Sequence, residues 1–149
     1  GHELRRWETP VSVKPGNSVR LQTIEAMMDS VRLRTDEVMH AELTQSGRVM
    51  AQDWLWFAPL AEFAPTPGRL TVRAMRETDG SWLVSIDVDR VTRLVEIEAD
   101  RRILCDDNYF ALRPGAPKTV HVESMEPCDA VTLSVAAWDG SVRQEIVLV

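Results

Sequence analysis

The sequence has few of the residues from which metal and redox sites are built. It contains two cysteines, Cys105 and Cys128, and three histidines, none in a spacing typical of zinc ligands. We therefore expect neither a metal nor a cofactor. The two cysteines lie beside predicted turns and could form a disulfide, but isolated cysteines are more often small buried hydrophobic residues.

Long apolar runs and clusters of positive charge are also missing. No window approaches the roughly twenty consecutive apolar residues that a membrane-spanning helix needs, and the start GHELRRWE has no apolar signal core. The net charge is −6 and the basic residues are scattered among acidic ones, whereas a nucleic-acid binder needs clustered cations. We expect no membrane and no nucleic acid among the partners, and we take the cytoplasm as the provisional compartment.

Motifs of catalysis are missing too. The sequence has no glycine-rich phosphate loop, no G-x-S-x-G motif and no Cys/His pair in an activating neighbourhood. Carboxylates are abundant, but Glu96, Glu98 and Asp100 alternate along a predicted strand, as on an ordinary solvated face. No residue is therefore assigned a catalytic role.

What the sequence does contain is apolar alternation with a period of two, the pattern of half-buried strands. It is clearest in residues 82–89, where every second side chain from Trp82 to Val88 is apolar. A strand at 70–75 and the turn Asp79-Gly80 complete a predicted β-hairpin. Further strands are predicted at 93–98, 109–112, 118–123, 131–137 and 142–149. Short strands at this spacing predict an all-β sandwich or barrel.

The first part of the chain also alternates, and two prolines end it. Residues 25–30 could form one helical turn, in which Met28 would plug the core. Pro65 and Pro67 block both helix and strand pairing, so we place a domain boundary at 64–68. The strands before it are too few to close a two-sheet core, which indicates part of a domain. These strands are predicted at 11–13, 19–24, 37–44 and 49–57, the last two joined by a turn at 45–48.

Four tryptophans have positions that suggest a role. Trp54 and Trp56 are two residues apart and share one strand face. An exposed pair could stack on sugar rings, whereas a buried pair would belong to a core or to a seam between domains. Trp82 and Trp138 are expected to be core anchors.

The stretch Asp106-Asp107-Asn108 puts three oxygen-bearing side chains in a row. Such a row could bind a calcium ion or a sugar hydroxyl. Asp and Asn also bind the backbone next to them in turns, and we favour that second interpretation.

The same region carries a resemblance to a known family. Asp107-Asn108-Tyr109-Phe110, Leu112-x-Pro114-Gly115 and Lys118-Thr119-Val120 resemble the signature D-N-Y-F-x-L-x-P-G-x-x-(K/R)-T-V of glycoside hydrolase family two β-mannosidases and exo-β-glucosaminidases. Further pieces in matching order are Val11 to Val19, Trp56-Phe57-Ala58-Pro59 and Thr92 to Ile97, so the resemblance extends from about Val11 to the end.

The resemblance implies a multidomain enzyme whose catalytic (β/α) barrel carries two glutamates and acts by the retaining mechanism. A barrel needs about 250 residues, so neither glutamate is in this chain. Residues 3–63 would then end the penultimate β domain, and residues 69–149 would form the last, immunoglobulin-like β-sandwich. The fold expected is thus an immunoglobulin-like sandwich preceded by a partial one.

The function implied is that of a non-catalytic accessory region, which supports the catalytic barrel of the same chain. The parent enzyme would hydrolyse a terminal β-linked mannose or a related sugar. The alternative is a carbohydrate-binding module that binds an oligosaccharide through Trp54 and Trp56.

The signature residues would then form a corner where the chain crosses between sheets. Asp107 and Asn108 would turn the chain, and Tyr109 would bury its ring while its hydroxyl caps backbone groups. One of Tyr109 and Phe110 must face inward. Pro114 presets φ and Gly115 takes the positive-φ position of a type II turn.

An incomplete first domain has a consequence for assembly. Residues 11–57 would expose a sheet edge and an apolar face that missing strands would otherwise cover. We expect this part to pack on the last domain, to self-associate with a second copy through the exposed sheet edge, or to be poorly ordered.

Overall fold

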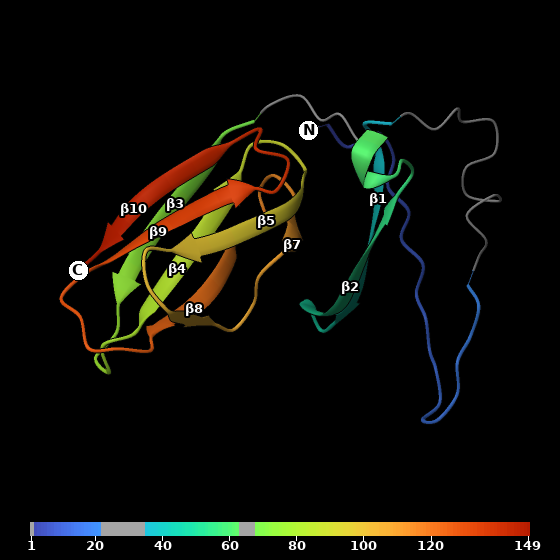
Figure 1. Ribbon diagram of the computed structural model, residues 1–149. Helices are drawn as coiled ribbons and strands as arrows, with labels where there is room; N and C mark the ends of the chain where they lie inside the picture. The colour runs from blue at the N-terminus through green and yellow to red at the C-terminus, as the bar shows by residue number, and fades with distance from the viewer. Residues whose placement is uncertain (1, 22–34, 63–67) are drawn as a thin grey trace. The chain divides into compact units, whose positions relative to one another are not determined.

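The computed structural model describes residues 2–21, 35–62 and 68–149. Apart from strands it contains one short 3₁₀ helix, η1 (Leu60–Glu62), in the part described. Among those residues, no helix is long and apolar enough to span a membrane. The chain divides into two compact units, His2–Ala64 and Pro65–Val149 (Figure 1).

The second unit is a sandwich of two antiparallel sheets, each with four strands (Figure 1). The all-β prediction is therefore confirmed. The first sheet has the order β3 (Leu70–Arg76), β4 (Trp82–Val88), β8 (Lys118–Ser124), β6 (Ile103–Cys105). The second has the order β10 (Arg143–Leu148), β9 (Val131–Ala137), β5 (Thr92–Ala99), β7 (Phe110–Leu112).

The core between the sheets is made by the alternation read from the sequence. In β4, Trp82, Val84, Ile86 and Val88 are all buried, which confirms the predicted inward face. Across the core, Val95 and Leu133 are fully buried. Each such aliphatic side chain contributes about 1.5–3 kcal/mol relative to exposure, so this face holds the sheets together.

Trp138 was expected to be a core anchor, and that expectation is wrong. Its side chain is 54% exposed. In β9, residues Val131, Leu133, Val135 and Ala137 face inward, so with a period of two the next side chain faces outward. Trp138 therefore lies on the outer surface, although its backbone N–H donates to the Leu94 carbonyl oxygen at 2.9 Å.

One side of the sandwich is closed by a side chain. The backbone N–H of Val72 in the edge strand β3 donates to the Oε1 atom of Gln144 in the edge strand β10 at 3.0 Å. Gln144 thus satisfies an edge amide that has no strand partner on that side. At the opposite side, the edge strands β6 and β7 are only three residues long. Strand β6 was not predicted, because three residues are too few to show a period of two.

The first unit contains a two-stranded antiparallel sheet of β1 (Val38–Gln45) and β2 (Arg48–Trp56). The predicted hairpin is confirmed. Ser46 and Gly47 have φ angles of 51° and 78°, the left-handed pair that a tight hairpin turn requires.

Other expectations for the first unit are wrong or lie outside the described residues. Residues 11–13 do not form a strand, and Val11 and Val13 are exposed. Alternation alone is insufficient, since a strand needs a partner to complete its backbone hydrogen bonds. Residues 19–21 are not a strand either. Residues 22–24, the expected helical turn at 25–30 with Met28, and most of the boundary at 64–68 lie outside the described residues.

Candidate functional site

The chain crosses from one sheet to the other between β6 and β7, in the segment Asp106 to Tyr109. This segment includes the start of the signature, and the predicted crossing is there. Asp106 directly follows the last residue of β6. Asn108 lies two residues before the first residue of β7.

Asp106 binds the segment to the first sheet. Its backbone N–H donates to the His121 carbonyl oxygen at 3.2 Å, and the His121 N–H donates to Asp106 Oδ1 at 2.9 Å. His121 is in β8, the strand that pairs with β6. The carboxylate thus continues the ladder beyond Cys105, the last residue of β6.

Asn108 binds the segment to the second sheet. The Ile97 N–H donates to Asn108 Oδ1 at 2.8 Å, and Asn108 Nδ2 donates to the Ile97 carbonyl oxygen at 3.0 Å. A side-chain amide has the same donor and acceptor as a peptide group, so it substitutes for a strand residue opposite β5. Asp could not do this, because an ionised carboxylate has no donor.

Tyr109 does not have the predicted role. Its side chain is 52% exposed, and its hydroxyl donates to Glu96 Oε1 at 2.8 Å instead of capping backbone groups. The backbone at Tyr109 is left-handed, with φ of 57°, which is compatible with the ring pointing out while Phe110 packs on the core. The Glu96 carboxylate that accepts this bond raises the pKa of Tyr109, since the bond favours the neutral phenol.

Lys118, the first residue of β8, connects the remaining signature residues. Its Nζ atom lies 2.5 Å from Asp107 Oδ2 and 4.8 Å from the centre of the Phe110 ring. The other oxygen of Asp107 accepts the Asn108 N–H at 2.8 Å. A cation between a carboxylate and a ring face is stabilised by both.

The turn between β7 and β8 has the predicted form. The N–H of Ala116 donates to the Arg113 carbonyl oxygen at 3.3 Å, and Gly115 has a φ of 73°. Positive φ at the third residue is the mark of a type II turn, with Pro114 before it.

One side-chain oxygen each of Asp106, Asp107 and Asn108 accepts a backbone N–H, and the second oxygen of Asp107 binds Lys118. Across residues 2–21, 35–62 and 68–149, no group of three or more His, Cys, Asp or Glu side chains could hold a metal ion. Cys105 and Cys128 are both free and both half-buried. The polar side chains of this corner thus serve mainly as hydrogen-bond acceptors for backbone N–H groups.

The tryptophans of β2 form a stack with a histidine of β1. The rings of Trp54 and Trp56 are stacked, with centroids 5.6 Å apart and an interplanar angle of 14°. The His40 ring is tilted by 39° to the Trp54 ring, and their centroids are 4.1 Å apart. Trp54 and Trp56 are half-buried, and Trp54 has two neighbouring rings. A sugar stacks on a free ring face, and these two neighbours occupy part of the space around Trp54.

A polar cluster that the sequence analysis missed centres on Ser81. Its hydroxyl donates to Asp79 Oδ1 at 2.6 Å and lies 2.9 Å from His121 Nε2. Ser81 is only 4% exposed, so the hydroxyl is not open to a substrate. The signal available in the sequence was Asp79-Gly80-Ser81, in which an Asp at a turn accepts bonds from two residues ahead. These bonds from Ser81 lower the pKa of Asp79.

Beside this cluster is an open hollow of about 410 Å³. Arg76 lies over the Trp82 ring there, with its Cζ atom 5.6 Å from the ring centre. Glu123 and Glu126 also line the hollow.

The fold and the crossing define an immunoglobulin-like β-sandwich domain, in which Asn108 and Lys118 bind neighbouring strands and side chains at the crossing. Residues 66–145 match the family of the mannosidase Ig-fold domain, and the chain belongs to this family. A search of curated proteins finds no match.

Replacing Asn108 by Asp is expected to lower the free energy of unfolding by about 1–3 kcal/mol, because the Ile97 carbonyl oxygen loses its donor. Urea unfolding followed by tryptophan fluorescence measures this. Tyr109→Phe is the matched control, and it should destabilise the protein clearly less than Asn108→Asp, since the bond of Tyr109 to Glu96 is at the surface. Equal losses in the two variants would contradict the role given to Asn108.

In the variant Asp79→Asn, the free energy of unfolding is expected to fall less as the pH is lowered. The folded pKa of Asp79 is below its usual value of 3.8, so the ionised carboxylate stabilises the fold above that pH. This stabilisation is lost as the pH falls through the lower, folded value. Urea unfolding at about pH 5 and about pH 2 should therefore show a smaller fall in the variant. Ser81→Ala should reduce the fall in the same direction, and an unchanged fall in both variants would rule the mechanism out.

Proposed function

We propose that this chain is a non-catalytic accessory region of a β-mannosidase-like glycoside hydrolase, and that it supports the catalytic (β/α) barrel of the same parent chain. In this proposal residues 3–63 end the penultimate β domain and residues 69–149 form the last domain. The family match over residues 66–145 supports a mannosidase context. The parent would hydrolyse a terminal β-linked mannose or a related sugar.

The observation that carries the proposal is how the side chains at the crossing, Asp106 and the first signature residues, are bonded. Asp106 and Asn108 each bind one strand of a different sheet, and Asp107 binds Lys118. A retaining glycosidase needs two carboxyl groups about 5–5.5 Å apart that flank a substrate. The carboxylates of this corner are instead committed to the backbone and to Lys118. The signature therefore fits a support and not a reaction centre.

The stack of His40, Trp54 and Trp56 favours support over sugar binding. Trp54 has His40 and Trp56 as ring neighbours, whereas a sugar-binding platform presents an open flat face. In an accessory region, such half-buried aromatic rings are typical of an interface with another domain of the enzyme.

The test is to recover the native protein from its source with an antibody against residues 68–149. The proposal expects an antigen much larger than the 16.8 kDa of this chain, and expects the precipitate to hydrolyse p-nitrophenyl β-mannoside or the β-glucosaminide. An antigen of the size of this chain, with no glycosidase activity in the precipitate, would refute it.

A titration of tryptophan fluorescence with mannobiose and a manno-oligosaccharide separates support from carbohydrate binding. We expect no saturable change up to about 10 mM, a limit that corresponds to a binding free energy of about 3 kcal/mol. A saturable change that Trp54→Ala or Trp56→Ala abolishes, and that Trp138→Ala leaves intact, would instead establish a carbohydrate-binding module. Trp138 is a suitable control because it is exposed and belongs to the other unit.

A further inference from the structure

The outer edge of β2 has no strand partner in the part of the chain that the structure describes, where its sheet consists of β1 and β2 alone. An isolated two-stranded hairpin is marginally stable in water. This one also exposes apolar side chains, since Leu43, Val49, Met50 and Leu55 are between 39% and 54% exposed. An edge of this kind is a template for a further strand.

The sequence of β2 is complementary to itself in the antiparallel direction. The strand has nine residues, Arg48–Trp56, and its middle residue is Gln52. A two-fold axis through Gln52, perpendicular to the sheet, would pair the whole strand with its copy. Such an axis also keeps even-numbered residues on the same face in both copies.

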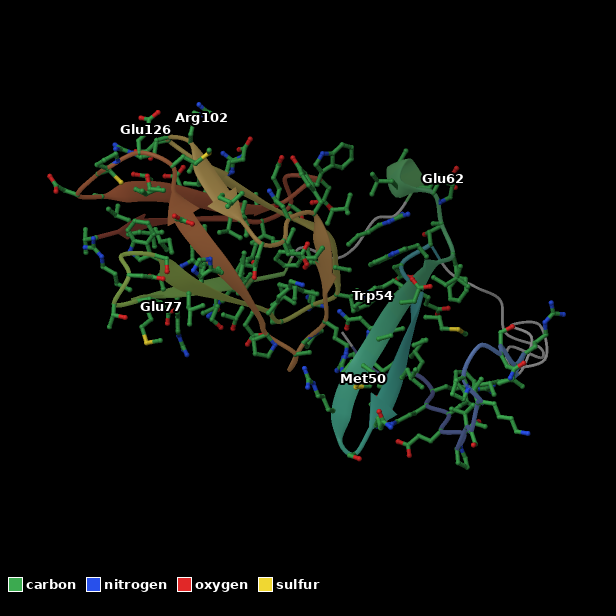
Figure 2. The ribbon with its side chains drawn as sticks, turned by 90° about the horizontal axis from the view of Figure 1, so that it is seen from below. Met50, Trp54, Glu62, Glu77, Arg102 and Glu126 are labelled. Atoms are coloured by element: carbon green, nitrogen blue, oxygen red, sulfur yellow. The ribbon has the colours of Figure 1, made fainter. Side chains whose placement is uncertain are left out.

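This register forms several favourable pairs and places no like charges opposite each other. Met50 lies opposite Trp54, which gives a sulfur–aromatic contact, and Val49 lies opposite Leu55. Figure 2 labels Met50 and Trp54 on this strand. Arg48 lies opposite Trp56, and the two Gln52 amides face each other across the axis. Ala51 lies opposite Asp53, so no two like charges meet.

Neighbouring registers are poorer. An axis through Asp53 would place the two Asp53 carboxylates opposite each other, which is destabilising. An axis through Ala51 would shorten the overlap and lose the Met50–Trp54 pairs. The register centred on Gln52 is the one that pairs all nine residues.

We propose that a second copy of this chain binds the β2 edge in antiparallel orientation, in the register centred on Gln52. The two hairpins then form one four-stranded sheet in the order β1, β2, β2 of the second copy, β1 of the second copy. Cross-strand backbone hydrogen bonds and the Met50–Trp54 pairs hold the dimer. The other unit of each chain is not required for this contact.

Charged substitutions at Ala51 test the register, because a cation and a carboxylate there should shift the dissociation constant of the dimer in opposite directions. Ala51→Lys places a cation opposite Asp53 of the second copy, and Ala51→Asp places a carboxylate there. Two such pairs form in each dimer, so the dissociation constant should fall roughly 2- to 30-fold with Lys and rise by a similar factor with Asp. Sedimentation equilibrium of the whole chain over a concentration series measures both.

Two controls keep the result specific. Thr44→Lys and Thr44→Asp make the same charge changes on β1, away from the β2 edge, and should leave the dissociation constant unchanged. The double variant Ala51→Asp with Asp53→Lys restores opposite charges across the axis and should restore the dimer. Circular dichroism checks that each variant keeps its strands.

The proposal is overturned by a wild-type chain that stays monomeric at its highest soluble concentration. It is equally overturned by a dimer to which Ala51→Lys and Ala51→Asp do the same thing, or by open-ended aggregates in place of a dimer. Opposite shifts with rescue by the double variant support it.

Discussion

The sandwich depends on one constraint: the chain must leave one sheet and join the other without leaving backbone groups unpaired. Two side chains solve this within three residues. Asp106 extends the ladder of β8, and Asn108 substitutes for a strand residue beside β5. The crossing is therefore hydrogen-bonded to both layers at once, and the position of β7 follows from it. Lys118 then ties the start of β8 to the same corner.

Much of the second unit could be predicted because β4, β8 and β9 bury alternate side chains. The hairpin of β1 and β2 could be predicted from apolar alternation and from the turn at Gly47, although none of its side chains is fully buried. This reasoning fails where strand pairing, and not alternation, decides whether a strand forms. Val11 and Val13 alternate but form no strand, while β6 pairs with β8 over only three residues. The hydrophobic period of the sequence predicts neither the missing strand at 11–13 nor the short strand β6.

The candidate site was predicted in kind but not in detail. A turn of Asp and Asn residues before a strand could be read from the sequence, as could the positive φ of Gly115. The left-handed backbone of Tyr109 could not, since few non-glycine residues adopt it and no local pattern marks them. The partners of Asn108 and Asp106 lie 11 and 15 residues away in the chain, so only the folded topology reveals them.

The Gln144 side chain that closes the edge between β3 and β10 has a consequence for how such domains coexist on one polypeptide. A neighbouring β domain that folds at the same time presents strands of similar pattern, and cross-pairing between neighbours is a common failure of multidomain chains. Here the long edge strand β3 has an amide already bound by Gln144, and β6 and β7 are too short to recruit a foreign strand. The edges of this unit therefore offer few free positions at which a strand of a neighbouring β domain could pair.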